Sequence, residues 1–450
     1  MVAIRGNITG TAEILGGRRF SQAGDPTKFG FFWLSAFFVV YCARPEDWVP
    51  GLQYLPCAKI AAILAMWGLF NAMGKTKRKL KDVPKEGKLL LLLIGLLFVA
   101  GLFSPIWKGG AVNHTIDFAK VWVAWTLTFL LITSFDRLRQ IIRIQAVSVA
   151  VICAISIIKG YSQPRLEGVI GGIYSNPNDL AFAVVLTLPF ALAFLITSKG
   201  ALKKALWVLA MLIMLTTLFL TASRAGFIDL IISGTVTLWY FGVKGKRPGL
   251  IAGVLLSAVL LGAAAGGKLY SRFEALGGDS TTEESAYGSY KQREYLMKVA
   301  LEGIEKHPLL GLGAGNFQTY SGTWREVHMT YLQICVEAGI PALIVYLMFI
   351  SCGFKNLRVV RKAKDLDTHT VLFIGALHSS LVGFLVGALF APEAYQFFPY
   401  FAVAFTSVLR QIVKERELEA GTVDPVRSKP RHFLEAYAHF GRTGTVAPVR

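Results

Sequence analysis

Long runs of apolar residues constrain this chain more than any other feature of its sequence. Residues 89–103 and 205–223 contain no Asp, Glu, Lys or Arg. About 18 to 25 apolar residues suffice for a helix to span a bilayer, whereas transmembrane β-strands alternate in polarity over about ten positions. Only 17% of residues are charged, against about 25% in an average soluble protein. The sequence therefore predicts an all-α polytopic membrane protein and excludes a soluble globular domain.

We expect about twelve transmembrane helices. Their expected ranges are 29–43, 57–74, 89–107, 118–134, 141–158, 180–197, 205–222, 225–243, 249–266, 329–352, 370–390 and 396–412. The predicted organisation is an N-terminal tail (1–28), nine helices (29–266), one large loop (267–328), three helices (329–412) and a polar tail (413–450). We expect this last tail to be largely disordered because it has few apolar residues.

Basic residues predict the orientation of these helices. Most of the 47 Lys and Arg residues lie in the two tails and in every second connection. Cytoplasmic loops carry such an excess, so both termini are expected in the cytoplasm and the loop 267–328 on the outer side of the membrane. The net charge of +19 then lies at a membrane surface, where anionic lipids attract it, and nucleic-acid binding is not predicted.

Neither a zinc site nor another metal site is expected. The five cysteines are too few and too scattered for a zinc site or a disulfide framework. Cys42 and Cys57 flank one short loop, where they either pair or remain ordinary thiols. No Asp-x-Asp pair lies in an outer loop, and the acidic doublet Glu283-Glu284 lies in a stretch with few apolar anchors. No cofactor is predicted.

The large loop contains the signals of an amphipathic helix. Ser289 followed by Gln292 three residues later is typical of a helix start with a capping box. Apolar residues then recur at helical spacing at Leu296, Val299, Ala300 and Ile304. His307-Pro308 should end the helix, because a residue before proline avoids helical backbone angles. The pattern predicts a helix over residues 290–306 that lies against the membrane face.

A glycine-rich stretch, residues 310–317 (LGLGAGNF), follows this helix. Alternating glycines allow the backbone to approach a ligand or a neighbouring helix closely. No Gly-Lys-Ser/Thr follows, so this is not a Walker loop. A tight turn without a ligand remains an equal interpretation.

Two arginines are expected at the outer face. Arg224 lies between two predicted spans with almost no loop, and an arginine so close to hydrocarbon is costly unless it is paired or reaches the surface. Asp229, inside the next span, is a possible partner. Arg293 lies in the first turns of the amphipathic helix, where a positive charge opposes the helix dipole. It is either solvated or in contact with an anion.

Other polar residues at the outer face are candidates as well. His328 begins the tenth predicted span, and an imidazole there titrates near neutral pH or has only a structural role. Glu337 is on roughly the opposite helix face, so we expect it to bond another helix. After the Asn176-Pro177 turn, Asn178 or Asp179 should cap the sixth span.

Five segments, in this order, resemble the O-antigen ligase and O-antigen polymerase superfamily. They are 176–178 (NPN), 223–226 (SRAG), 289–293 (SYKQR), 307–317 (HPLLGLGAGNF) and 328–339 (HMTYLQICVEAG). The resemblance covers roughly residues 170 to 345. It implies a polytopic glycosyltransferase of the GT-C type, which passes a glycan from a polyprenyl-pyrophosphate carrier to a hydroxyl of lipid A core, another glycan or a protein.

The resemblance also implies which residues act. The family's two outer-face arginines and its histidine correspond to Arg224, Arg293 and His328, as catalytic residues. Asn178, Asn316 and Tyr331 are added as candidate substrate-binding residues within the matching segments. Two guanidiniums suit a pyrophosphate leaving group, and a histidine suits activation of an acceptor hydroxyl, so the predicted transfer is metal-independent.

Alternatives remain open at this point. The same residues suit a polysaccharide polymerase or a protein O-oligosaccharyltransferase, because only the acceptor differs. A transporter or flippase of a lipid-linked or anionic substrate would have charged groups near the bilayer midplane, whereas here the polar candidates gather at one face. A non-catalytic assembly protein is the remaining class.

Overall fold

The computed structural model describes residues 25–76, 78–160, 165–168, 174, 176–254, 256, 259, 283–363 and 366–421. These residues form helices, turns and loops, with no strand among them. The helices in chain order are α1 (Lys28–Ala43), α2 (Pro45–Trp48), α3 (Cys57–Ala72), α4 (Lys85–Leu102), α5 (Lys108–Leu131), α6 (Phe135–Gly160), α7 (Pro177–Thr197), α8 (Ala201–Thr221), α9 (Arg224–Leu238), α11 (Glu283–Lys306), α12 (Phe317–Tyr320), α13 (Thr330–Val360), α14 (Thr368–Gly387) and α15 (Phe397–Glu419). Short 3-10 helices at Leu52–Tyr54 and Leu80–Asp82 and a π-helical turn at Trp239–Val243 complete this set.

The all-α membrane class is confirmed, but the number of spans is not. Eleven of the twelve predicted ranges coincide with helices, and most of the ninth range, 249–266, lies outside the described residues. Six helices are long and apolar enough to cross a membrane, namely α6, α7, α8, α9 with its π-helical extension, α13 and α14. The chain is therefore a multi-pass membrane protein for which twelve spans remain an expectation.

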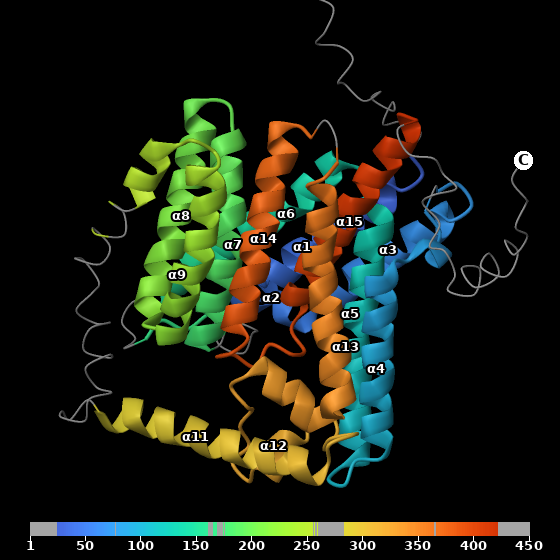
Figure 1. Ribbon diagram of the computed structural model, residues 1–450, viewed down its shortest axis with the longest axis vertical. Helices are drawn as coiled ribbons and strands as arrows, with labels where there is room; N and C mark the ends of the chain where they lie inside the picture. The colour runs from blue at the N-terminus through green and yellow to red at the C-terminus, as the bar shows by residue number, and fades with distance from the viewer. Residues whose placement is uncertain are drawn as a thin grey trace, which may run out of the picture.

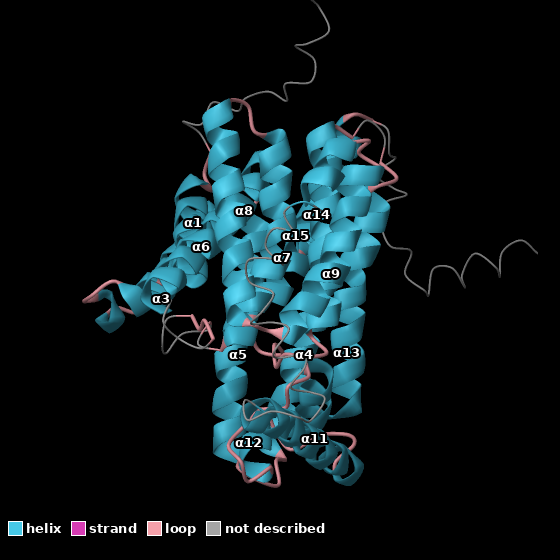
Figure 2. Ribbon diagram, turned by 90° about the vertical axis from the view of Figure 1, so that its left-hand side faces the viewer, coloured by secondary structure: helices cyan, strands magenta, loops and turns pink. Residues whose placement is uncertain are grey.

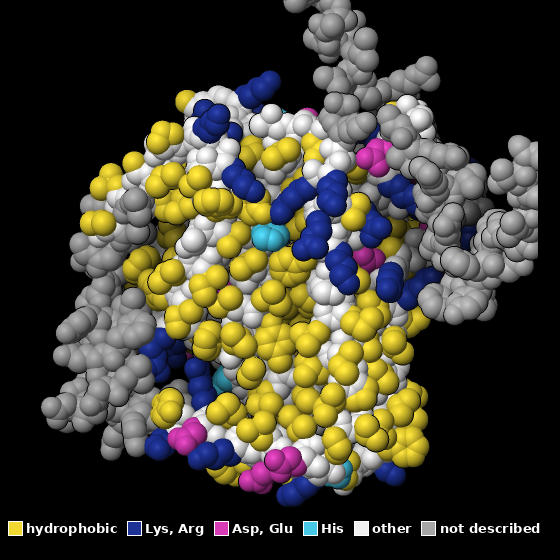
Figure 3. All heavy atoms as spheres, in the orientation of Figure 1, with side chains coloured by type: hydrophobic (Ala, Val, Ile, Leu, Met, Phe, Trp, Pro, Cys, Tyr) yellow, Lys and Arg dark blue, Asp and Glu magenta, His cyan; other side chains and the backbone are white. Residues whose placement is uncertain are grey.

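The helices stand side by side as a bundle, and α11 lies across one end of it (Figure 1). We call this end the α11 end and the opposite end the basic end. Helix α7 lies inside, with nearly all of its side chains buried, whereas α8 exposes leucines such as Leu202 and Leu206. Lys and Arg side chains gather near the basic end, and an apolar belt separates them from the mixed charges at the α11 end (Figure 3). This distribution is typical of a protein that spans a membrane.

Buried ion pairs tie the helices together at the basic end. Arg78 is buried, and its guanidinium donates to both carboxylate oxygens of Glu415 in α15, at 2.8 and 2.9 Å. It also donates to the backbone oxygens of Phe129 and Ile132, at 2.9 and 2.7 Å. The guanidinium of Arg78 therefore has acceptors on several sides, as a buried charge requires.

Cys42 and Cys57 are both free thiols, so the pairing left open from the sequence is not present.

Helices α4, α5 and α13 extend past the other helices and support α11 and α12 (Figures 1 and 2). Helix α11 ends at Lys306, directly before His307-Pro308, as predicted. Its predicted start is wrong, because the helix already begins at Glu283 and Ser289 lies inside it rather than capping it. The capping-box pattern is short and local, and here the helix continues through it.

The glycine-rich stretch packs against a break in α13. Gly339 has a φ of 82° and a ψ of 171°, so α13 is two helices joined at a kink. Backbone N–H groups of Leu312 and Gly313 donate to the oxygens of Val336 and Glu337, both at 2.9 Å. The last carbonyls before a helix break need such donors. Of the alternatives left open for this stretch, the structure shows close approach to a neighbouring helix.

Candidate functional site

Two helix N-termini are joined at the α11 end. The Asn176 side chain accepts a hydrogen bond from the Asn178 backbone N–H at 2.9 Å, so the cap of α7 is Asn176 and the prediction of Asn178 or Asp179 was wrong. Asn178 Oδ1 instead accepts from the Ser223 hydroxyl at 2.7 Å. That hydroxyl in turn caps α9 by accepting from the Gly226 N–H at 3.1 Å. These hydrogen bonds fix the position of the start of α9, and therefore the backbone position of its first residue, Arg224.

Arg224 and Arg293 lie near each other although they are far apart in the sequence. Burial, and then the positive charge of Arg224, lower the pKa of Arg293. In the part of the chain that the structure describes, Arg224 Nη1 and Arg293 Nε are buried and have no hydrogen-bond partner. Two neighbouring guanidiniums favour an anion, and one of them, Arg224, lies at the electropositive N-terminus of α9. The arrangement can therefore bind a phosphate-like group.

His328 lies next to this arginine pair, two residues before the start of α13. Burial and then the positive charges of Arg293 and Arg325 lower the pKa of His328 to about 4. Its Nδ1 atom is buried and has no partner among the described residues. The imidazole is therefore neutral at physiological pH and free to accept a proton. On the face shown in Figure 3, Lys and Arg side chains and a histidine gather between α9 and α11.

The structure gives Asn316 and Tyr331 contacts within the protein. The Asn316 amide donates to Ser104 Oγ at 2.7 Å, to the Trp107 oxygen at 3.1 Å and to the Leu312 oxygen at 3.0 Å. These bonds join the glycine-rich stretch to the turn between α4 and α5. The Tyr331 hydroxyl donates to the Leu385 oxygen of α14 at 2.9 Å. Neither residue shows a contact that links it to the two arginines or to His328.

Asp229 does not pair with Arg224. Its carboxylate is buried against Gly383 and Gly387 of α14, and neither oxygen has a hydrogen-bond partner among the described residues. The suggested pairing of these two residues is therefore absent from the structure. Glu337 does bond a distant segment, because the Tyr395 hydroxyl donates to its Oε2 at 2.5 Å. Tyr395 lies in the turn between α14 and α15, however, and not in another helix as expected.

A comparison with protein families identifies which known family part of this chain resembles. Residues 209–347 match the family model described as O-antigen ligase. This match supports the O-antigen ligase/polymerase superfamily for this part of the chain. The match supports a ligase- or polymerase-type activity and lipid-linked glycans as the class of substrate. A search of curated proteins finds no match.

The O-antigen ligase segment contains most of the site. Arg224, Arg293 and His328 all lie within it, as do Asn316 and Tyr331, whereas Asn178 precedes it. The hydrogen bond from Ser223 to Asn178 therefore connects the matched segment to α7, which lies before it. Ser223 belongs to a motif that the sequence showed, but nothing in the sequence indicated that its hydroxyl bonds Asn178.

Sequence reasoning missed a group of neighbouring buried carboxyl groups, those of Asp179, Glu326 and Glu393. Burial raises the pKa of Glu326, although a hydrogen bond from the Gln318 side-chain amide at 3.0 Å opposes this rise. Burial, and then the negative charges of Asp179 and Glu326, raise the pKa of Glu393 well above its ordinary value. The three carboxyl groups come from three distant segments, so no sequence motif could reveal them. Among the described residues, no group of three His, Cys, Asp or Glu side chains is positioned to hold a metal ion.

Proposed function

We propose that this protein transfers a glycan from a polyprenyl-pyrophosphate carrier to an acceptor hydroxyl, as an O-antigen ligase-type glycosyltransferase. One observation carries the proposal: Arg293 is the electrostatic neighbour of both Arg224 and His328. Side chains from three separate parts of the chain are thus linked electrostatically through Arg293. A cationic pair beside a neutral imidazole suits an anionic leaving group and a hydroxyl nucleophile.

The two arginines would hold the pyrophosphate. As the bond between the sugar C1 and the phosphate oxygen breaks, negative charge grows on the leaving pyrophosphate. Guanidinium groups bind such oxygens in a bidentate manner, and donors fixed before the reaction stabilise charge that develops in the transition state. The buried Nη1 of Arg224 and Nε of Arg293 have no other partner among the described residues. The N-terminus of α9, where Arg224 lies, adds its dipole to the same charge.

His328 would position or deprotonate the acceptor. The acceptor oxygen forms the new bond to C1, and its proton has to leave. A neutral imidazole can take that proton, and His328 Nδ1 is buried without a partner among the described residues. Because the pKa of His328 is lowered to about 4, we assign it first to orienting the hydroxyl and then to accepting the proton as the leaving group departs.

The proposed setting is a bacterial inner membrane with both termini in the cytoplasm. The α11 end then faces the periplasm, where lipid-linked glycans meet lipid A core, growing glycans or proteins. Ligase, polymerase and protein O-oligosaccharyltransferase activities would use the same three residues and differ in the acceptor. No step in the proposed mechanism requires a metal ion.

The direct test is glycan transfer by purified protein in liposomes that contain a polyprenyl-pyrophosphate-linked oligosaccharide. We expect Arg224→Ala, Arg293→Ala and His328→Ala each to lower transfer at least 100-fold at normal protein levels. Lys298→Ala, on the exposed face of α11, is the matched control and should transfer at the normal rate. Unchanged transfer in all three variants would remove the enzymatic assignment.

Two further measurements complete this test. A chelator should leave transfer unchanged, and strict dependence on added Mg²⁺ would contradict the arginine clamp. Glycan profiling of a deletion strain would then identify the acceptor. Loss of capped lipopolysaccharide, of long polysaccharide chains or of glycoprotein each corresponds to a different member of the proposed class.

A further inference from the structure

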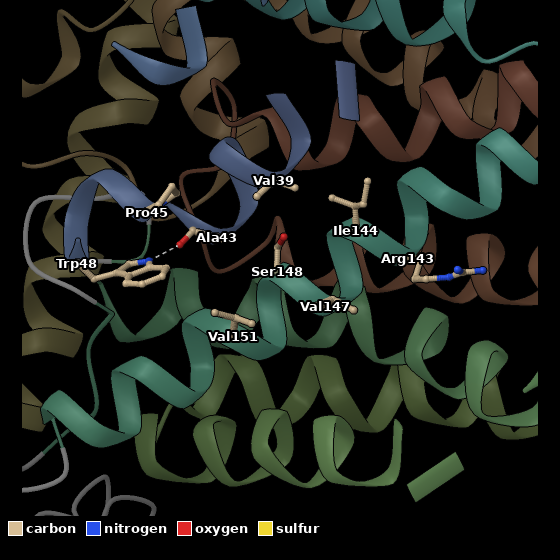
Figure 4. A pocket seen from close by; sticks show the side chains of 9 residues that line it. All are labelled: Val39, Ala43, Pro45, Trp48, Arg143, Ile144, Val147, Ser148 and Val151. Carbon is tan, nitrogen blue, oxygen red and sulfur yellow. Dashed lines mark hydrogen bonds between the residues drawn. The ribbon is translucent and has the colours of Figure 1, made fainter. Parts of the chain in front are cut away.

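A groove runs along the surface of the bundle and is lined by none of the residues of the α11-end site. It lies between α1, α2 and α6, with a volume of about 420 Å³ (Figure 4). Val39 and Ala43 line one side, Val147 and Val151 the other, with Trp48 at one end and Arg143 at the other. Apart from Arg143 and Ser148, every lining residue is apolar. The groove therefore suits a hydrocarbon chain rather than a sugar or a peptide backbone.

The groove opens toward the surrounding lipid. Val39 of α1 and Val147 and Val151 of α6 remain 42%, 46% and 38% exposed, although their helices pack together. Between α6, which is long and apolar enough to span a membrane, and the shorter apolar helix α1, such a space suits lipid, because polar groups are not stable there without partners. Arg143 and Val151 are eight residues apart, which is about 12 Å along a helix. That length is close to one leaflet of a hydrocarbon core about 30 Å thick.

The two ends of the groove differ in chemistry. At the end away from the basic end, the Trp48 indole N–H donates to the Ala43 oxygen at 2.7 Å and so forms a fixed wall. At the other end, the Arg143 side chain extends away from the groove along α6 (Figure 4). Its guanidinium lies over the ring of Phe194, 5.5 Å from the centroid. An aliphatic stem along the groove with a charge beyond it is how an arginine reaches a lipid headgroup.

A second arginine lies beside the same end of the groove. Arg139 is one helical turn earlier in α6 and so shares a face with Arg143. Arg139 Nε is buried without a hydrogen-bond partner, and across the described ranges neither arginine forms an ion pair. Both guanidiniums lie over aromatic rings, those of Phe135 and Phe373 for Arg139 and that of Phe194 for Arg143. Asp136 and Asp367 lie close enough to act electrostatically on Arg139, but neither forms an ion pair with it. Two adjacent cations whose charges are not paired in this way are complementary to a phosphate group.

We propose that this groove binds one acyl chain of an anionic phospholipid from the leaflet at the basic end, with the lipid phosphate held by Arg143 and Arg139. The polyprenyl chain of a glycan donor is a poorer occupant, because its pyrophosphate would be held at the opposite end of the bundle. This inference does not rest on the proposed function. It concerns other helices and another leaflet, so either can fail alone.

Native mass spectrometry of the purified protein tests the proposal, with phosphatidylglycerol and phosphatidylcholine offered in equal amounts. We expect phosphatidylglycerol to be retained at least fivefold more than phosphatidylcholine. Arg139→Gln with Arg143→Gln should remove this preference. Val147→Trp, which fills the groove, should lower retention of the bound lipid at least fivefold.

Controls keep these outcomes decisive. Ile158→Trp places the same bulk on α6 at a residue that is 81% exposed and outside the groove, and Lys159→Gln removes a positive charge elsewhere on α6; both should bind lipid normally. Thermal unfolding in detergent identifies any variant that does not fold, and a milder Val147→Met then replaces the tryptophan variant. Equal retention of the two lipids, normal retention by the groove variants, or displacement of the lipid by inorganic phosphate would each overturn the proposal.

Discussion

The hydroxyl of Ser223 donates to Asn178 Oδ1 at 2.7 Å and so joins the start of α9 to the start of α7. The Ser223 hydroxyl oxygen also accepts a hydrogen bond from the Gly226 N–H, so the hydroxyl acts both as a donor and as an acceptor. Arg224 follows directly, so its backbone is fixed by a bond between two helices rather than by its own helix alone. The geometry of the proposed anion clamp therefore depends on a residue that contacts no substrate.

Ser223→Ala should weaken both the fold and donor binding. The variant loses an N-cap and an inter-helix hydrogen bond, which together cost about 1–2 kcal/mol of unfolding free energy. We expect the KM for the lipid-linked donor to rise several-fold, with a smaller change in kcat. Ser223→Thr keeps the hydroxyl and should restore both. Ser351→Ala is the control. It removes a hydrogen bond from the Ser351 hydroxyl to the Met348 oxygen at 2.8 Å within another helix, α13, and should leave the KM unchanged.

Gly339→Ala should prevent the break in α13 from forming. A Cβ atom at Gly339 would lie 2.2 Å from the Leu309 backbone oxygen, and its φ is 82°. We expect a loss of about 4 kcal/mol or more, or failure to fold. Gly322→Ala is the matched control, since its φ is 70° but nothing lies within 4 Å of the added Cβ. It should cost only about 1–2 kcal/mol. Similar thermal unfolding of the two variants would contradict the close-packing argument.

His328 should make the fold sensitive to acid. Its pKa is lowered to about 4 in the folded protein, against about 6.5 in an unfolded chain. Between these values the unfolded chain binds a proton that the folded chain does not, so stability falls as the pH drops through this window. His328→Gln should remove a pH-dependent loss on the order of 1–3 kcal/mol. The measurement is the melting temperature at pH 7 and pH 4.5 for both proteins.

The same lowered pKa predicts how transfer depends on pH. The imidazole stays neutral between pH 8 and pH 6, so the rate should be constant there if His328 is the group that accepts the proton. Arg325 contributes to the low pKa of His328. Arg325→Gln should therefore shift the acidic fall in rate toward higher pH. A rate that rises steadily from pH 6 to pH 8 would indicate that another group controls proton transfer.

Glu326→Gln should stabilise the protein at alkaline pH. Burial raises the pKa of Glu326, so the folded state favours the protonated carboxyl and loses stability as the pH rises above the ordinary carboxyl range. The glutamine removes this cost and can keep the contact with Gln318, so the melting temperature at pH 8 should rise. Glu294→Gln should not raise it, because bonds from Lys298 and Lys291 lower the pKa of Glu294. A lower melting temperature for Glu326→Gln would contradict this account.

The sequence by itself determined the membrane class, the approximate range of most helices and the end of α11 at His307-Pro308. These features depend on hydropathy and on backbone preferences, which act within one segment and can be read from it. The ordered motifs also pointed to the superfamily that residues 209–347 match. Where local signals competed, they were less reliable: the Ser289 pattern lies inside α11, and the α7 cap is Asn176.

Only the tertiary structure decided which residues meet. The pairing of Ser223 with Asn178, the use of the Asn316 amide against Ser104 and Trp107, and the proximity of Glu326 to Glu393 each join segments that are distant in the chain. Such contacts are set by how the helices pack, and packing depends on the shapes of many side chains at once rather than on any local pattern. For the same reason, no sequence pattern predicted the groove between α1 and α6.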